Sequence, residues 1–326
     1  GDYCLATGVL DLNGKTLTIN GNLIQSGGEI VINGGVLDVK GDYRIQSRTE
    51  KEDGTYSYGY STGYLTMTNE ADKVKIGGSF VTDSSVNHSG KLTAGTMEIG
   101  GDFTQNSSKS SYNFAASGSH KVTFTSDKKH VVSVSSSNSY FNKLDITGAE
   151  IELKYDTYLK NELIGEDGVI TGKTIVICNN AKVPSVINGN VEIYGNYTLA
   201  KDVQIKGSLY LHGSQFDLSG YTLTVDGDTT SYDSTINLNK GTYNSNGNFS
   251  VGNYSRLNIV NSEDKLNVQK NFSFLNSSYY YTSQITSGKI NIKGNCIIDS
   301  GYFRPSGENE IIFSGEKKQE VKVTNT

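Results

Sequence analysis

Short apolar stretches that alternate with polar residues recur along the chain, and glycine-rich corners separate them. Between residues 17 and 43 three such stretches follow one another, each only a few residues long, and the pattern then returns to its starting point. Alternation over so few residues is typical of strands with one face inward, and glycines allow the positive φ angles of the turns between them. This segment therefore predicts one coil of a solenoid.

The corner itself has a motif: an aliphatic residue, any residue, Ile or Val, any residue, Gly, then Asn, Asp or Ser, then an aromatic or aliphatic residue. Several successive corners lie roughly 20 to 24 residues apart, a period that marks solenoids. The motif recurs at Gly21, Gly41, Gly78, Gly101, Gly195, Gly207, Gly227 and Gly294, more weakly at Gly247, and with Lys270 in place of glycine.

This periodicity predicts an all-β fold, a single-stranded parallel β-helix with about 20–24 residues per coil, and crossover geometry favours the right-handed form. A coil of that size gives about 15 coils over the whole chain. We expect the inward aliphatic side chains of successive coils to stack in columns. Such positions include Leu17, Ile19, Leu37, Val39, Met97, Ile99, Leu223 and Val225.

A longer repeat lies on top of the coils. Residues 114–118 return 189 residues later as 303–307, and residues 65–69 return 192 residues later as 257–261. We interpret residues 1–148 and 149–326 as two copies of one module within one continuous β-solenoid, 1–326. Because strand alternation continues between the copies, we expect no flexible linker there.

The first copy carries about 14 extra residues, which fall within residues 48–60 and predict a loop protruding from the solenoid wall. Tyr56, Tyr58 and Tyr60, with Tyr64 nearby, alternate there with Ser, Gly and Thr, a mixture typical of adaptable recognition loops. The second copy offers Tyr279, Tyr280 and Tyr281 at another position. The alternative interpretation is that these rings lie on the wall and shield apolar strand faces.

Composition narrows the class of protein. Of 326 residues 37 are glycine, two are proline and none is tryptophan, and the apolar residues are evenly spread, which favours a quasi-linear core. The net charge is −5 with both signs interspersed, so the basic stripe needed for nucleic-acid binding is missing. The sequence has no signal peptide and no apolar run long enough to insert into a membrane.

The cysteines and histidines predict no metal site and no cofactor. Three widely spaced cysteines form neither a disulfide framework nor a zinc motif. Cys296 stands where related coils carry Tyr or Phe, and we expect it to be a small buried apolar residue. The four histidines are scattered along the chain.

Parallel β-helices also serve as polysaccharide lyases and glycoside hydrolases, so an enzyme is the alternative function. Such a site needs carboxylates that converge on one strand face. The densest group is Asp217, Asp226, Asp228 and Asp233. Asp226 and Asp228 flank the corner at Gly227, where solvated turn residues are expected, and we interpret the group as structural.

Four segments resemble the repetitive regions of large surface proteins from Gram-positive, clostridia-like bacteria: residues 41–47, 88–105, 114–118 and 140–146. The resemblance runs from residue 1 to about residue 148 and is weaker, though in register, in the second copy. It implies a β-helical stalk or adhesin segment in the cell wall or on the cell surface, outside the cell, with no transferable catalytic motif. A glycan or a host or partner cell-surface protein is the ligand that we expect for the tyrosine-rich segments.

The sequence begins in the middle of the repeat pattern, because residues 1–3 match the corner at residues 41–43. We therefore expect a natural protein that continues past Thr326. Because neither end resembles a capping repeat, we also expect open strand edges at both ends and end-to-end self-association of the chain.

Overall fold

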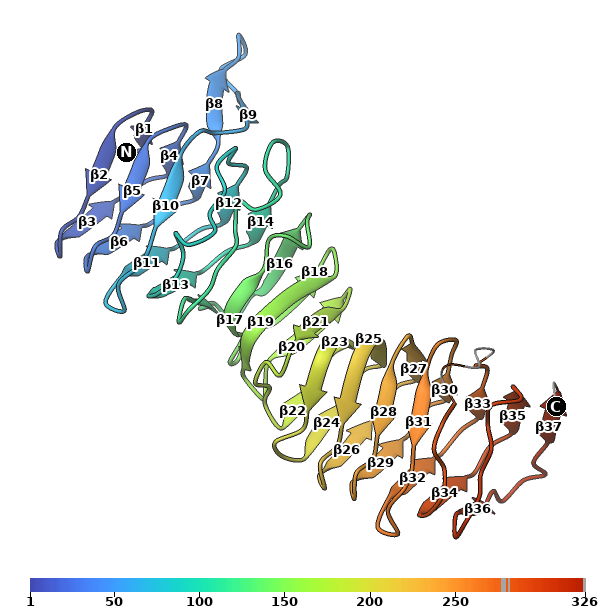
Figure 1. Ribbon diagram of the computed structural model, residues 1–326. Helices are drawn as coiled ribbons and strands as arrows, with labels where there is room; N and C mark the ends of the chain where they lie inside the picture. Colours follow the sequence, from blue (N-terminus) through green and yellow to red (C-terminus); the bar gives the residue numbers. More distant parts are fainter. Residues whose placement is uncertain (277–279, 281, 325–326) are drawn as a thin grey trace. The chain divides into compact units, whose positions relative to one another are not determined.

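The computed structural model describes residues 1–276, 280 and 282–324. Over these residues the chain is all-β without an α-helix, and its parallel strands stack as a β-solenoid of about 15 turns with about 21 residues per turn (Figure 1). The predicted fold class is thereby confirmed. The chain divides into two compact units, Gly1–Ile175 and Val176–Thr326, and each is described by itself.

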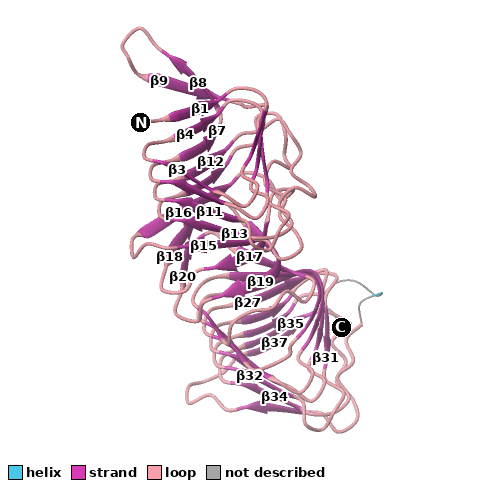
Figure 2. Ribbon diagram, turned by 90° about the vertical axis from the view of Figure 1, so that its left-hand side faces the viewer, coloured by secondary structure: helices cyan, strands magenta, loops and turns pink. Residues whose placement is uncertain are grey.

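The first unit consists of three parallel sheets, each running through successive coils (Figure 2). The first sheet contains β1 (Tyr3–Leu5), β4 (Leu23–Gln25), β7 (Tyr43–Ile45), β12 (Phe80–Thr82), β14 (Phe103–Gln105), β16 (Lys129–Val134), β18 (Glu150–Leu153) and β20 (Val169–Gly172). The second contains β2 (Val9–Asp11), β5 (Glu29–Val31) and β10 (Tyr64–Thr66). The third contains β3 (Thr16–Ile19), β6 (Val36–Val39), β11 (Lys73–Ile76), β13 (Thr96–Ile99), β15 (Lys121–Phe124), β17 (Phe141–Asp145) and β19 (Thr157–Ile164).

The second unit repeats this arrangement, and β21 (Ile175–Cys178) spans the division between the units. One sheet contains β22 (Val186–Ile187), β24 (Val203–Ile205), β26 (Thr222–Val225), β29 (Thr242–Ser245), β32 (Lys265–Val268), β34 (Lys289–Ile292) and β36 (Glu310–Phe313). The remaining strands are β23 (Val191–Thr198), β25 (Leu209–Asp217), β27 (Thr229–Tyr232), β28 (Thr235–Asn237), β30 (Phe249–Val251), β31 (Arg256–Asn258), β33 (Phe272–Phe274), β35 (Cys296–Asp299) and β37 (Val321–Thr324).

Inward side chains stack in columns, as the alternation predicts. Leu37 lies between Leu17 and Val74, its Cα partners in the neighbouring coils, and Met97 continues the same column. Leu37 and Met97 are fully buried. In the second unit Leu223 and Val225 of β26 pair with Val203 and Ile205 of β24. Stacking on the neighbouring coils completes the burial of the apolar side chains of each coil, so strands of only three or four residues are long enough to build a continuous core.

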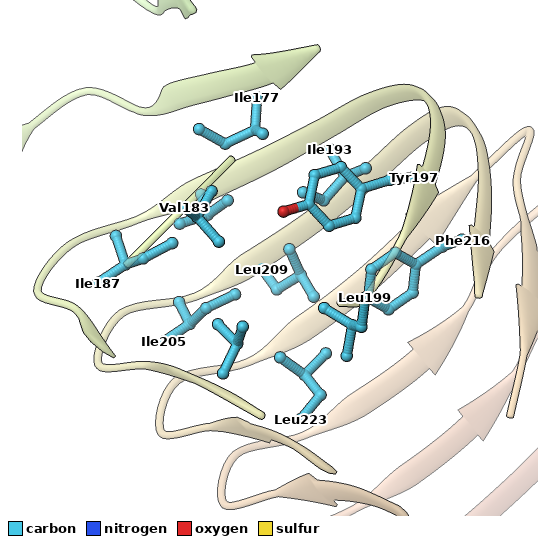
Figure 3. A pocket seen from close by; sticks show the side chains of 12 residues that line it. Ile177, Val183, Ile187, Ile193, Tyr197, Leu199, Ile205, Leu209, Phe216 and Leu223 are labelled. Atoms are coloured by element: carbon cyan, nitrogen blue, oxygen red, sulfur yellow. The ribbon is translucent and has the colours of Figure 1, made fainter. Parts of the chain in front are cut away.

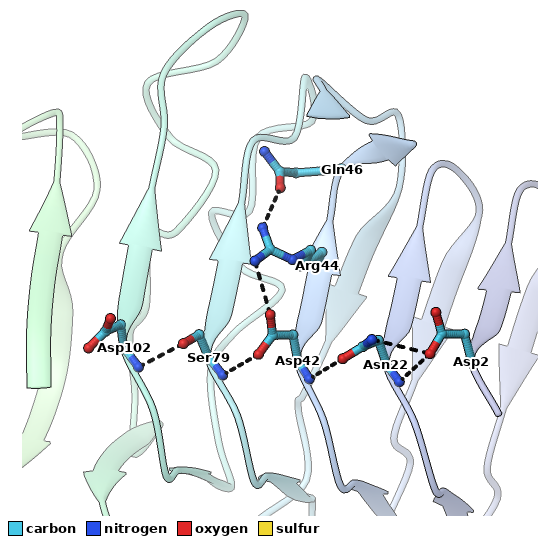
Figure 4. Close-up of polar contacts among 7 residues, drawn as sticks. All are labelled: Asp2, Asn22, Asp42, Arg44, Gln46, Ser79 and Asp102. Atoms are coloured by element: carbon cyan, nitrogen blue, oxygen red, sulfur yellow. Dashed lines mark hydrogen bonds and ion pairs between the residues drawn. The ribbon is translucent and has the colours of Figure 1, made fainter. Parts of the chain in front are cut away.

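The corner motif builds a hydrogen-bonded ladder along one edge of the first unit (Figure 4). At each corner the Asn, Asp or Ser side chain accepts a hydrogen bond from the backbone amide of the equivalent residue one coil later. The bonds run from Asn22 N to Asp2 Oδ1 (2.9 Å), Asp42 N to Asn22 Oδ1 (2.8 Å), Ser79 N to Asp42 Oδ1 (2.8 Å) and Asp102 N to Ser79 Oγ (3.0 Å). The second unit has the same ladder through Asn190, Ser208, Asp228, Asn248, Asn271 and Asn295.

The residue after a ladder position is buried at every corner except Tyr3, and it is an aromatic residue at Tyr43, Phe80, Phe103, Phe249 and Phe272. In the first unit the Tyr43 and Phe80 rings pack edge to face with centroids 5.4 Å apart, and Phe103 follows. In the second unit Phe272 pairs in register with Cys296, which is buried. Burial raises the pKa of the Cys296 thiol to about 11. Cys296 thus takes the place of an aromatic ring, which confirms the sequence-based interpretation.

The insertion of the first copy forms an antiparallel hairpin outside the parallel sheets. Its strands are β8 (Ser47–Glu50) and β9 (Tyr56–Gly59), and Figure 1 shows them projecting beyond the coils of the first unit. The sequence predicted a protruding loop here; the paired strands within it were not foreseen. Tyr and Thr favour such pairing because they are good strand formers.

Candidate functional site

The hairpin turn is closed by its own side chains and backbone. Lys51 N donates to Thr55 O at 2.8 Å, and Gly54 takes a positive φ of 78°. The carboxylate of Asp53 accepts the backbone amide of Thr55 at 2.9 Å. These contacts fix the turn, so the register places Arg48 opposite Tyr58 and Glu50 opposite Tyr56.

An ion pair anchors the base of the hairpin to the neighbouring coil. Arg48 Nη1 lies 2.9 Å from Asp2 Oδ2, and Arg48 Nη2 donates to the Cys4 sulfur at 3.3 Å. The pKa of Asp2 is lowered below its usual value, first by the hydrogen bond from the Asn22 backbone amide and then by the one from Arg48. The hairpin is therefore oriented by contacts with the coil that contains β1.

Tyr56, Tyr58 and Tyr60 come together on this hairpin, and each ring lies against a cation. The Arg48 guanidinium lies 4.4 Å from the Tyr56 ring centroid and that of Arg44 lies 4.7 Å from Tyr58. Lys109 Nζ lies 5.1 Å from the Tyr60 centroid. The rings remain 41–46% exposed. Each of these three rings therefore has a cation beside it.

Tyr64 has a different setting from the other three tyrosines. It lies in β10, where it is half-buried, and its hydroxyl donates to Glu29 Oε2 at 3.0 Å in the adjacent coil. This hydrogen bond raises the pKa of Tyr64. Lys91 Nζ lies 4.1 Å from the ring centroid. Tyr64 therefore links coils of the wall.

The second predicted tyrosine group is only partly described. Tyr279 and Tyr281 lie outside the described residues. Tyr280 is 80% exposed, and its carbonyl accepts a hydrogen bond from Arg256 Nη2 at 2.5 Å. This residue offers a large accessible ring.

A further aromatic column lies on the outer face of the second unit, and the sequence analysis missed it. Tyr194, His212 and Tyr232 are Cα partners in successive coils, and Tyr254 extends the column. Successive ring centroids lie 6.4, 5.8 and 5.9 Å apart, all edge to face. The sequence held one signal, because the first three rings each precede a Gly or Asp, a turn-forming residue type: Gly195, Gly213 and Asp233, all of which take a positive φ in the structure.

Three of the four carboxylates considered for catalysis, those of Asp217, Asp226 and Asp228, take part in coil-to-coil contacts. Asp226 accepts hydrogen bonds from Gln204 Nε2 (3.0 Å) and Asn246 Nδ2 (2.8 Å), and Asp228 accepts the Asn248 amide (2.8 Å). Asp217 accepts a hydrogen bond from Asn239 Nδ2 in the next coil (3.2 Å) and one from the Ser219 backbone amide within its own turn (2.7 Å). Within the described part of the chain, no group of three or more His, Cys, Asp or Glu is placed to hold a metal ion.

The interior of the second unit contains a small apolar cavity of about 10 Å³ (Figure 3). Its lining includes Ile177, Ile193, Leu209 and Phe216, with Tyr197 at one side. Burial raises the pKa of Tyr197 to about 12. A space of this size holds at most about one water, so it is a packing gap and not a ligand site.

Comparison of the chain with protein-family models, with curated proteins and with solved structures finds no match in any of the three. Among the residues described, there is no helix with the length and apolar character needed to cross a membrane.

Proposed function

We propose that this protein is a structural and adhesive segment of a bacterial surface protein, located outside the cell and non-catalytic. The observation that carries the proposal is the hairpin β8–β9, which presents Tyr56, Tyr58 and Tyr60 together on a projecting element with 41–46% of each residue exposed. Exposed tyrosines held in place are well suited to recognition, because they offer flat amphipathic area at low entropic cost. The ligand would be a glycan or a partner cell-surface protein.

The scaffold supports this role mechanically. Neighbouring coils are joined by parallel strand pairing and by the hydrogen bonds of the corner ladder. These many hydrogen bonds make the solenoid a firm support for the projecting hairpin. A polysaccharide-degrading enzyme is the rival function. The Asp226 and Asp228 carboxylates are engaged in coil contacts, and this favours the adhesive role over the enzymatic one.

The test replaces Tyr56, Tyr58 and Tyr60 together with serine and measures attachment of the purified chain to bacterial and animal cells and to immobilised glycans. We expect attachment to be lost while the thermal unfolding midpoint stays nearly unchanged, because the rings lie outside the core. Tyr155→Ser with Tyr221→Ser is the matched control, since these tyrosines are 52% and 38% exposed elsewhere on the surface. A triple variant that attaches normally but melts markedly earlier would show that the tyrosines are packing residues.

A further inference from the structure

The aromatic column of the second unit borders a second row of outward side chains. Glu192, Tyr210 and Thr230 are Cα partners in the same three coils, two residues before Tyr194, His212 and Tyr232. Residues two apart in a strand point to the same face, so the two rows lie side by side on the outer surface. Tyr210 is 43% exposed and Tyr232 is 49% exposed.

The two rows form an open groove of about 350 Å³. Its floor is the wall of the solenoid at Leu211, and its sides are built by the two rows: Glu192, Tyr210, His212, Thr230 and Tyr232. The groove combines broad aromatic surface with a few polar groups, the composition typical of small-molecule sites. It lies far along the sequence from the hairpin and involves none of its residues.

The charge of the lining restricts the ligand. The groove contains one carboxylate, Glu192, whose Oε1 lies 3.6 Å from His212 Nδ1, and none of its lining residues is Lys or Arg. An anionic ligand would meet the carboxylate without a permanent cation to compensate, which is unfavourable. Uncharged ligands with apolar faces and hydroxyl groups fit this lining better.

We propose that this groove, lined by Tyr210, His212 and Tyr232, binds a neutral oligosaccharide. The apolar faces of the sugar rings stack on Tyr210 and Tyr232, and the column through Tyr194 and Tyr254 extends the platform along the coils. Sugar hydroxyls donate to the Glu192 carboxylate and exchange hydrogen bonds with the Thr230 hydroxyl. This glycan site is separate from the hairpin, so either can fail alone.

A proline-rich peptide is the competing occupant of an aromatic groove. Its recognition needs donors for the peptide carbonyl groups, as well as aromatic surface. The hydroxyls of Tyr210, Thr230 and Tyr232 supply such donors, but the Glu192 carboxylate itself needs donors. A proline-rich peptide has few of them, because proline lacks a backbone N–H. The lining therefore favours a glycan, whose hydroxyl groups are donors as well as acceptors.

The test titrates residues 1–326 with neutral cello-, chito- and xylo-oligosaccharides by saturation-transfer NMR and calorimetry. We expect one of these series to bind, with affinity rising from the disaccharide to the tetrasaccharide as more rings are covered. Tyr210→Ser combined with Tyr232→Ser should weaken binding about tenfold or more, equivalent to about 1.4 kcal/mol. Tyr210→Phe keeps the ring and should retain most of the affinity.

Tyr221→Ser is the control, because Tyr221 is also exposed but does not line the groove. It should leave the affinity unchanged, and circular dichroism should show all variants folded. The proposal is overturned if none of the neutral oligosaccharides binds, or if the double variant binds as well as the parent. Preferential binding of a polyanionic oligosaccharide or a proline-rich peptide at the groove would also overturn it.

Discussion

Asp72 in the first unit and Asp264 in the second hold the same position in their modules, and each carboxylate accepts three backbone amides. Both side chains are buried. The donors to Asp72 are Gly34 (2.6 Å), Thr68 (2.7 Å) and Asn69 (3.0 Å), and those to Asp264 are Lys240 (2.6 Å), Val260 (2.7 Å) and Asn261 (2.9 Å). The repeated sequence therefore builds one hydrogen-bonding unit twice, tying a corner to the coil before it.

Replacing Asp264 by alanine should lower the free energy of unfolding by about 1–3 kcal/mol, because it leaves amides without their acceptor. Asp264→Asn should cost less, since one oxygen acceptor remains. Guanidinium unfolding followed by circular dichroism measures both. Asp53→Ala, in the exposed hairpin turn, is the control and should cost much less. Equal losses in Asp264→Ala and Asp53→Ala would contradict this role.

At the corner residue Gly41, glycine is required because no room exists for a Cβ atom, and not because the backbone has a positive φ. A Cβ there would lie 2.4 Å from Asn22 Oδ1 and 2.9 Å from the Gly21 carbonyl oxygen. We predict that Gly41→Ala lowers the free energy of unfolding by about 1–3 kcal/mol through overpacking. Gly1→Ala is matched to it, because Gly1 holds the equivalent position two coils earlier and an added Cβ there meets no atom within 4 Å. Thermal unfolding of the two variants should differ clearly, and similar midpoints would refute the steric argument.

Much of this architecture could be predicted from the sequence. The alternation of apolar and polar residues around Leu37 predicted the strands and their inward columns, and the recurring glycine predicted the corners. Both patterns are local in the sequence and recur in successive coils. The sequence did not show that Asn22 and Asp42 are joined by a hydrogen bond, although it located the residues. That bond depends on the register between coils.

The candidate sites were less predictable, since they depend on contacts between distant residues. The extra residues of the first copy located the hairpin, yet the approach of Lys109 to Tyr60 crosses coils and leaves no local pattern. The column from Tyr194 to Tyr232 was missed for a related reason. Tyr194 and His212 are 18 residues apart, whereas His212 and Tyr232 are 20 residues apart, so a fixed period does not align the rings.

Two buried histidines in the first unit should make stability depend on pH. Burial lowers the pKa of His120 to about 4, and burial together with the charge of Lys91 lowers that of His88 to about 3. Neither ring nitrogen of His120 has a hydrogen-bond partner among the residues described. Because the unfolded chain takes up these protons near pH 6.5, stability is complete above that pH and falls as the pH drops towards 4.

The measurement is the free energy of unfolding between pH 7 and pH 4.5 for the parent and for His120→Leu. Each buried histidine adds at most about 1.4 kcal/mol per pH unit to the slope, so the variant should lose stability less steeply. Carboxylates titrate in both proteins and cancel in the difference. Identical slopes for the parent and His120→Leu would refute the assignment.

The orientation of the hairpin should depend on Arg48, which contacts both Asp2 and the Tyr56 ring. We predict that Arg48→Ala speeds amide hydrogen exchange in β8 and β9 without changing exchange in the parallel sheets. Lys109→Ala is the control, because it removes a cation from Tyr60 outside the paired strands. Unchanged protection of β8 and β9 in Arg48→Ala would show that the hairpin is held by other contacts.

The most direct test of the proposed function is to incubate the chain with the polysaccharides or cell-wall material it binds and to measure cleavage and retention together. New reducing ends report hydrolysis, and unsaturated uronate ends report a lyase. We predict retention of the protein on its ligand with no new ends formed, and weaker retention on replacing Tyr56, Tyr58 and Tyr60 with serine. Release of new chain ends in proportion to the amount of protein would contradict the non-catalytic, adhesive function.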